Sequence, residues 1–271
     1  MRIVVKVGTS TLAHPTGHLN IRHMESLCKV LSDIKNAGHQ VILVSSGAIG
    51  MGMGKLSLRE RPKTQVGKQA AAAVGQCELM YTYDKLFSEY NHTIAQILLT
   101  GGDVRDPERR ENFTSTMEHL LDMRVLPIIN ENDTVSTEEL GIGDNDTLGA
   151  IVATSIHADL LVLLSDIDGL FTDDPRQVPD AKLIPEIHEI TAEVLSHAGG
   201  KGSEIGTGGM ATKLSAAQMV MEAGGDMLIA NGKDPSILYD ILDGKPVGTR
   251  FVGNNRITGE NRIATKKEER A

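Results

Sequence analysis

The chain has 271 residues, 40% of them hydrophobic, which is enough for one large domain with a sizeable core. Its formal net charge of −9 argues against nucleic acid as a partner, because phosphate backbones are bound through clustered Lys and Arg side chains. No signal-peptide pattern opens the sequence and no apolar run is long enough to span a bilayer, so we expect a cytoplasmic protein with no membrane contact.

Six short runs rich in Val, Ile and Leu alternate along the chain with longer amphipathic stretches. The runs are nearly continuous in hydrophobicity, which is typical of parallel strands buried on both faces. They cover residues 2–7, 40–44, 93–99, 125–130, 160–164 and 226–230. Between them, apolar residues recur at steps of three and four, which predicts helices around 21–34, 66–80, 117–121, 148–155 and 214–220.

Strand and helix patterns alternate along the whole chain, without a linker or an internal repeat. This order predicts right-handed crossovers and one three-layer α/β/α sandwich with a mainly parallel central sheet. In such folds ligands bind beyond the carboxyl ends of the strands, so the loops at those ends are the places to look for chemistry.

The two cysteines, Cys28 and Cys77, both fall in predicted helices. Neither has a second Cys or His at metal-ligand spacing. We therefore expect two buried, reduced thiols.

The loops after the first two strands carry a lysine and small polar residues. Lys6 lies inside an apolar strand, where an amine is costly unless it reaches water or an anion, and Gly8 lets a ligand approach the backbone. A lysine that merely extends to solvent is the alternative. Ser46 offers a hydroxyl, and its turn offers backbone amides, to a ligand carboxylate. The glycine-rich segment 50–55 fits no phosphate-binding fingerprint, and we expect a flexible loop there, either a lid or a plain surface turn.

Acidic and amide side chains follow the fourth strand. Residues 131–146 contain six acids and no base. The Asn and Asp side chains of residues 130–133 and 143–146 are well placed to hold an ammonium group, whereas a solvated acidic loop is the structural alternative. The spacing does not fit a calcium-binding loop. Asp146 opens the next helix, where a carboxylate caps the helix or orients a lysine.

Two further loops are candidates for binding a nucleotide. Ser165 and Asp166, after the fifth strand, can contact ribose or adenine, although a purely structural turn also fits them. The last motif opens a helix and has the glycines, threonine and lysine typical of an anion cradle, with a glycine-rich connector as the alternative. Its residues are Thr207, Gly208, Gly209, Met210, Ala211, Thr212 and Lys213.

Together these loops resemble the amino acid kinase family, and within it the members that phosphorylate glutamate. The matching segments are VVKVGTS, VSSGAIG, NENDTVS, GIGDNDTLGA, LLSDIDGLF and GTGGMATK, in the family's order. The resemblance implies an α/β/α sandwich and a phosphotransferase with a carboxyl group as acceptor. The expected reaction is the ATP-dependent phosphorylation of the γ-carboxylate of L-glutamate to L-glutamyl 5-phosphate, the first step of proline biosynthesis.

The resemblance also implies roles for individual residues. Lys6 and Lys213 are expected to neutralise the transferring phosphoryl group, and Asp146 to hold both lysines in position. Glutamate is expected to contact Ser46, Asn130, Asp133 and Asn145. ATP is expected to bind Lys6, Ser165, Asp166 and residues 207–213, with Mg²⁺ carried on the nucleotide and no separate metal site.

The family further suggests how the chain is organised and regulated. We expect a kinase domain at 1–255, whose N-terminal part mainly binds glutamate and whose C-terminal part mainly binds ATP, and a loosely ordered charged tail at 256–271. Many bacterial members carry a C-terminal PUA domain, which we expect this chain to lack. Proline inhibition at a site overlapping the glutamate site, assembly into dimers or tetramers, and transfer of the product to glutamate-5-semialdehyde dehydrogenase are also implied.

Other functions stay open on the residues alone. N-acetylglutamate kinase and aspartokinase share the fold, but an acetylated amine carries no charge for the acidic loops to hold. A nucleoside monophosphate kinase would need Arg or Lys where these loops offer acids. A non-catalytic amino-acid sensor could keep Asp133 and Asn145, but it would have no reason to keep both Lys6 and Lys213.

Overall fold

The computed structural model describes residues 1–14, 18–136, 142, 144–175, 177–178, 180–197 and 209–254. Within these ranges an eight-stranded sheet runs in the order β3-β4-β2-β1-β5-β7-β8-β6. Its strands are β1 (Arg2–Val7), β2 (Gln40–Ser45), β3 (Ile94–Leu99), β4 (Leu126–Glu131), β5 (Leu160–Ser165), β6 (Glu186–Ile187), β7 (Asp226–Asn231) and β8 (Thr249–Phe251). The prediction of a mainly parallel sheet is confirmed, because only the pairing of β7 with β8 is antiparallel among the described strands.

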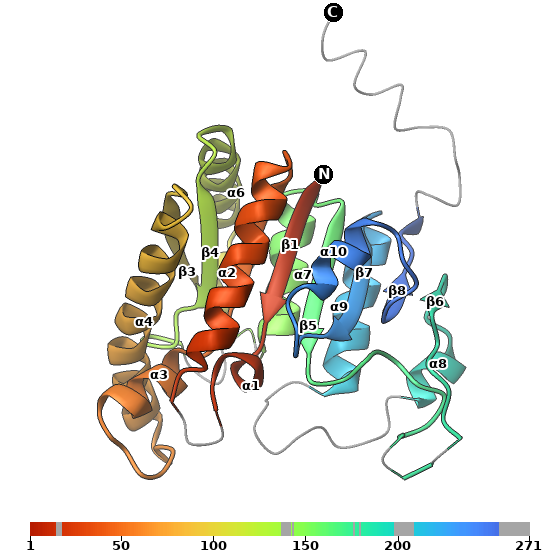
Figure 1. Cartoon of the computed structure of the whole chain (residues 1–271), viewed down its shortest axis with the longest axis horizontal. Helices are drawn as coiled ribbons and strands as arrows, with labels where there is room; N and C mark the ends of the chain where they lie inside the picture. Colours follow the sequence, from red (N-terminus) through yellow and green to blue (C-terminus); the bar gives the residue numbers. More distant parts are fainter. Residues whose placement is uncertain are drawn as a thin grey trace, which may run out of the picture.

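Helices cover both faces of this sheet, as predicted (Figure 1). In chain order they are α1 (Thr9–Leu12), α2 (Ile21–Asn36), α3 (Ala48–Lys55), α4 (Gln65–Ser88), α5 (Gly101–Arg105), α6 (Pro107–Asp122), α7 (Asn145–Ser155), α8 (Ala192–Ser196), α9 (Met210–Glu222) and α10 (Ile237–Leu242). Two core clusters show which helix covers which face: α6, α7 and α9 pack on one side, and α2, α4 and α10 on the other.

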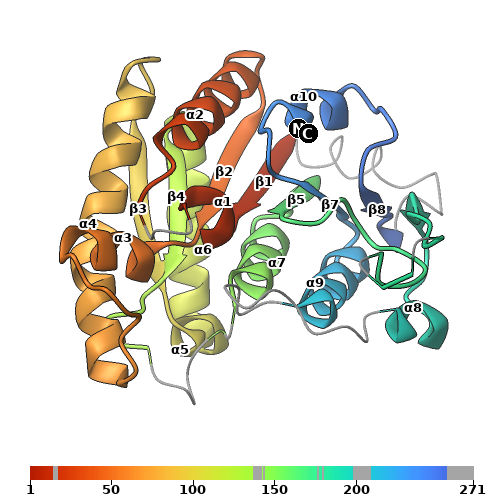
Figure 2. The ribbon, with the colours of Figure 1, turned by 60° about the horizontal axis from the view of Figure 1, so that its bottom comes forward.

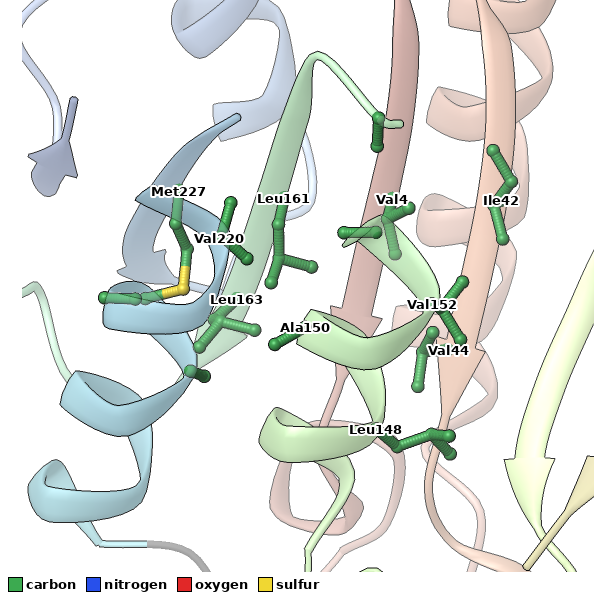
Figure 3. Packing of buried hydrophobic residues seen from close by; sticks show 14 of the residues in the cluster. Val4, Ile42, Val44, Leu148, Ala150, Val152, Leu161, Leu163, Val220 and Met227 are labelled. Atoms are coloured by element: carbon green, nitrogen blue, oxygen red, sulfur yellow. The ribbon is translucent and has the colours of Figure 1, made fainter. Parts of the chain in front are cut away.

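The two clusters follow from side-chain alternation along each buried strand. In β1, Val4 points into the cluster beneath α7, whereas Ile3 and Val5 point to the opposite face. Figure 3 shows the first cluster, in which side chains of α7 and α9 lie against those of the four central strands. The residues labelled there are Val4, Ile42, Val44, Leu148, Ala150, Val152, Leu161, Leu163, Val220 and Met227. The central strands are thus apolar on both sides, which is why the sequence showed continuous hydrophobic runs there rather than alternation.

The order of the strands reverses at β1. From β1 the chain continues to β2 on one side, while β5 pairs with β1 on the other side. At such a reversal the loops after neighbouring strands diverge to opposite faces of the sheet and leave a crevice at the carboxyl edge. Figure 2 brings this edge forward and shows the first turns of α7 and α9 arriving there from one layer.

Segment 50–55 is helical, so the prediction of a flexible loop or turn there is wrong. It belongs to α3, which packs directly on α4. A Cβ atom on Gly52 would lie 1.8 Å from the carbonyl oxygen of Ala71, and one on Gly75 would lie 1.7 Å from that of Ala48. Glycines that resemble a turn signal in the sequence here allow two helix backbones to touch.

The prediction that both cysteines are buried is right for Cys28 and wrong for Cys77. Cys28 is buried in α2, and burial raises the pKa of its thiol, but Cys77 is exposed on α4. The buried face of α4 carries Leu79, Tyr83 and Phe87, and residue 77 lies on the other side of the helix.

Two short strands, β6 and β8, were not predicted, because segments of two or three residues carry no periodic signal. The proposed charged tail lies outside the described residues. No helix in the described part of the chain is long and apolar enough to cross a membrane.

The close contact of α3 and α4 predicts a stability effect at Gly75. Gly75→Ala places a methyl group against backbone atoms that cannot rotate away, so we expect a loss of about 1–3 kcal/mol in the free energy of unfolding. Urea denaturation followed by circular dichroism measures this quantity. In α5, Gly102→Ala is a matched control, since its Cβ would approach only Thr100 Oγ1, at 3.5 Å. Equal midpoints for the two variants would contradict the packing argument.

Candidate functional site

Three charged side chains meet at the carboxyl edge of the sheet. Lys6 comes from the end of β1, Asp146 from the first turn of α7 and Lys213 from the first turns of α9. Lys6 Nζ lies 2.5 Å from Asp146 Oδ1, and Lys213 Nζ lies 2.8 Å from Asp146 Oδ2. Their side chains are only 11%, 8% and 1% exposed for Lys6, Lys213 and Asp146, respectively. The structure therefore brings together the three residues that the sequence singled out for phosphoryl transfer.

Asp146 can face the lysines because a neighbour caps the helix. Asp144 is the N-cap of α7, and one of its carboxylate oxygens accepts hydrogen bonds from the backbone N–H groups of Asp146 and Thr147. The hydroxyl of Thr147 donates to the other oxygen. Asp146 was expected either to cap the helix or to orient a lysine. Asp144 caps the helix, and the Asp146 carboxylate points to the lysines.

The cluster carries more positive than negative charge. Burial by itself raises the pKa of Asp146, but the ammonium groups of Lys6 and Lys213 outweigh burial and lower it, so this carboxylate is ionised at neutral pH. Two ammonium groups then share one carboxylate in a buried place. In a chain with a net charge of −9, such a surplus of positive charge is suited to an anionic ligand.

The first turn of α9 adds backbone dipoles to this charge. Gly209 is its N-cap and provides no side-chain hydrogen bond to the first turn, and a Cβ there would meet nothing within 4 Å. The backbone N–H groups at Met210, Ala211 and Thr212 therefore begin a helix of 13 residues without a side-chain cap. This arrangement fits the phosphates of a nucleotide. Thr207 and Gly208, predicted for the same cradle, lie outside the described residues.

Ser165 and Asp166 lie at the end of β5, on the same edge of the sheet. Ser165 is buried and its hydroxyl donates to Asp166 Oδ1 at 3.1 Å, whereas Asp166 is exposed. Within the described part of the chain, no hydrogen bond or ion pair connects these two residues to the lysine cluster. The two residues therefore share the carboxyl edge of the sheet with the lysines, without a described contact to them.

Polar side chains on the other side of β1 form one connected hydrogen-bond network, which we call the pocket wall. Asn145 Nδ2 donates to Ser46 Oγ at 2.7 Å and to Asn130 Oδ1 at 3.0 Å. Asn130 Nδ2 in turn donates to Gln76 Oε1 at 2.9 Å. Three of the residues predicted to contact an amino acid are thus brought together, although they are separated by up to 99 positions in the chain.

Asp133 lies next to this wall, in the turn after β4. Burial raises the pKa of Asp133 to about 6, the negative charge of Glu131 adds to the rise, and Arg61 opposes it. Glu131 itself accepts hydrogen bonds from Ser136 Oγ at 2.6 Å and from the backbone N–H of Ile142 at 3.0 Å. The described part of this acidic segment is therefore held in place rather than simply solvated, and Asp133 would gain from a cationic partner.

Several residues that support the site were not predicted from the sequence. Gln65 and Gln69 donate to the backbone oxygen of Ser136, and Gln76 accepts from Asn130. All three glutamines belong to α4. For Gln76 there was a signal in the sequence: with helical steps, it interrupts an apolar face between Ala72 and Leu79.

Comparison with known proteins agrees with this geometry. Residues 1–231 match the model of the amino acid kinase family. The chain is 52% identical over 255 residues to a glutamate 5-kinase of Clostridium perfringens, covering 93% of this chain and 95% of that protein. It is 55% identical over 249 residues to a glutamate 5-kinase of Clostridium tetani, covering 92% and 93%.

Solved structures extend the likeness to the fold. The crystal structure of T. acidophilum isopentenyl phosphate kinase superimposes with a TM-score of 0.66 at 18% identity, covering 93% of this chain and all of that one. At this identity the likeness concerns the fold alone. Through its sequence, its sheet and the family model that spans most of its length, this chain belongs to the amino acid kinase family.

Proposed function

We propose that this protein transfers the γ-phosphoryl group of ATP to the γ-carboxylate of L-glutamate and releases L-glutamyl 5-phosphate and ADP. The observation that carries the proposal is the buried pair of lysines on one carboxylate, next to a pocket wall of amide and hydroxyl groups. Glutamate 5-kinases that are more than half identical to the chain support the choice of substrate.

The reaction requires positive charge and alignment of the two reactants, and it does not require a general base. The side-chain carboxylate of glutamate is ionised at neutral pH, so its oxygen can attack the γ-phosphorus without losing a proton first. The new O–P bond forms as the bond from the γ-phosphorus to the β,γ-bridging oxygen breaks. The main obstacle is repulsion between the carboxylate and the phosphates, which Lys6 and Lys213 offset, while Asp146 fixes both amines.

The two ligands are proposed to enter from either side of Lys6. ATP would supply the phosphoryl group, with Mg²⁺ carried on it, against the first turn of α9 (Met210, Ala211, Thr212) and the loop at Ser165 and Asp166. Glutamate would lie against Ser46, Asn130 and Asn145, with its ammonium group at Asp133. In this proposal glutamate binds mainly to the N-terminal part of the chain and the nucleotide mainly to the C-terminal part.

Further properties belong to the same proposal and are supported by the resemblance to the family. They are inhibition by proline at a site overlapping the glutamate site, assembly into dimers or tetramers, and hand-over of the labile acyl phosphate to a glutamate-5-semialdehyde dehydrogenase. We also place the reaction in the cytoplasm.

A panel of acceptors tests the function directly. We expect ADP release with L-glutamate and little with N-acetyl-L-glutamate, L-aspartate or a nucleoside monophosphate, because the acidic pocket selects a free ammonium group at the right distance from the carboxylate. Coupled ADP detection with hydroxylamine trapping of the acyl phosphate measures this. If N-acetylglutamate or aspartate were the preferred acceptor, the proposed substrate would be wrong. Binding of glutamate without release of ADP would favour a non-catalytic amino-acid sensor.

Removal of Lys213 tests the phosphoryl-transfer role. In Lys213→Ala the developing charge on the phosphoryl oxygens loses one of its two lysines, so we expect kcat to fall by a factor of about 10²–10³. Glutamate affinity, measured by isothermal titration, should change little, because Lys213 makes no contact with the described pocket wall. Lys245→Ala is a matched control, since Lys245 is exposed and pairs with Asp240. A kcat within about threefold of the wild type would contradict the role.

The raised pKa of Asp133 predicts a pH dependence of glutamate binding. The ammonium group needs the ionised carboxylate, and protonation below about pH 6 removes that charge. The KM for glutamate should therefore rise as the pH falls from 7.5 to 5, approaching tenfold per unit below the pKa. In Asp133→Asn the KM should be high throughout and this dependence lost.

Steady-state kinetics across that range checks the prediction, with Asp122→Asn, at the end of α6, as the control that keeps the wild-type profile. An Asp133→Asn enzyme with the wild-type KM for glutamate and an unchanged pH profile would show that another group binds the ammonium group of glutamate.

A further inference from the structure

The hydrogen bonds of the pocket wall form a chain, and the donor-to-acceptor direction of this chain is fixed. The backbone N–H of Glu131 donates to Asn130 Oδ1 at 2.9 Å. A backbone amide can only donate, so the Asn130 side chain must turn its oxygen to that side and its Nδ2 to the other. On that other side lies Gln76 Oε1, which accepts from Asn130 Nδ2 at 2.9 Å.

The orientation of the Asn130 amide also determines the orientation of the Asn145 amide. Because Asn130 presents its oxygen, Asn145 must present Nδ2 to it, and the same Nδ2 group donates to Ser46 Oγ. Both hydrogens of that amide are then used, and Asn145 Oδ1 is left as the acceptor end of the side chain. Ser46 already accepts a hydrogen bond, so its own hydroxyl proton is available to donate.

These orientations match the two ends of an amino acid. The amide oxygen of Asn145, which takes no part in these hydrogen bonds, suits an ammonium group, and a hydroxyl donor on Ser46 suits a carboxylate. With the Asn145 amide reversed, its NH₂ group would face the ammonium and repel it. The pocket therefore depends on orientation as well as on position.

From this we propose that Gln76 is a positioning residue for substrate recognition: as a buried acceptor on α4, it holds Asn130 and through it Asn145 and Ser46 in the orientation that selects an α-amino acid. Gln76 is buried, and it reaches the chain from a helix rather than from a loop at the strand ends. Glu131 supplies the donor on one side of Asn130 and Gln76 the acceptor on the other, so that the amide is clamped from both sides. The inference rests on the proposed function, because it concerns the amino-acid side of that site.

Among the described interactions, Gln76 has no contact with Lys6, Asp146 or Lys213. A change at Gln76 should therefore affect the KM for glutamate rather than kcat or the KM for ATP. Gln76→Met keeps the length and burial of the side chain but removes the strong acceptor. We expect the KM for glutamate to rise about tenfold or more, while kcat and the KM for ATP stay within about threefold of the wild type. Gln76→Glu, which keeps an acceptor oxygen in either protonation state, should restore the glutamate KM to within about threefold.

A second measurement separates orientation from general damage to the pocket. Glutarate has both carboxylates of glutamate but no amine, so the ratio of glutarate to glutamate dissociation constants reports on recognition of the ammonium group. Isothermal titration should show this ratio shrinking in Gln76→Met and recovering in Gln76→Glu. Gln218→Met, on the exposed face of α9, is the matched control and should leave every parameter unchanged.

The outcomes separate this proposal from the one on which it rests. A wild-type enzyme that is inactive with glutamate would overturn the proposed function itself. An active wild type with an unaltered glutamate KM in Gln76→Met would overturn only the role of Gln76, as would a uniform loss of kcat, ATP binding and thermal stability. Should Gln76→Met not fold, Gln76→Asn, which falls short of Asn130 by one methylene, must show the same KM increase, and a wild-type KM there would refute the proposal.

Discussion

The carboxylate of Asp146 is the point on which the rest of this site depends. Without it, Lys6 and Lys213 would be two buried ammonium groups side by side, with nothing to offset their mutual repulsion. One shared carboxylate holds both amines in place, yet it neutralises only half of their charge. The remaining positive charge is available to an anion, which is what a phosphoryl-transfer site requires.

The fold supplies the three members of this cluster from three elements that end at one edge. Parallel strands bring β1 to the carboxyl edge, and the crossover helices α7 and α9 start there, so a strand end and two helix beginnings converge. Asp144 contributes by capping α7, which frees Asp146 for the lysines. The apolar cluster shown in Figure 3 fixes both helices against the sheet and thereby fixes the distances between the charges.

The amino-acid side is built differently, by helix α4. Near the carboxyl edge its side chains are glutamines that reach the loop at Ser136 and the amide of Asn130, whereas Tyr83 and Phe87, further along, belong to the core. Gly52 and Gly75 let α3 rest directly on this helix. Helix α4 thus connects packing and recognition, because the same face that anchors it in the core ends in the polar groups of the pocket.

Local patterns were enough to predict the class of fold, since apolar runs of five to seven residues separated by helical patterns admit few architectures other than a parallel sheet between helices. A lysine in a buried strand and a glycine-rich helix start also marked Lys6 and Lys213 as candidates, and the resemblance to the family added the expected role of Asp146. The prediction at 50–55 was wrong because glycine permits both flexible turns and close helix contacts, and only the neighbouring Ala71 and Gly75 decide between them.

The contacts between distant segments follow from three-dimensional packing. The lysines are contributed by segments far apart in the chain, and the short distances from both of them to Asp146 depend on the register of β1 with β5 and on the packing of α7 on α9. The role proposed for Gln76 could not be predicted from the sequence either, since the direction of the hydrogen-bond chain is set by a backbone amide at Glu131 that has no signature in the sequence. Periodicity reports how each segment faces the core, but contacts between segments depend on distances that local patterns do not contain.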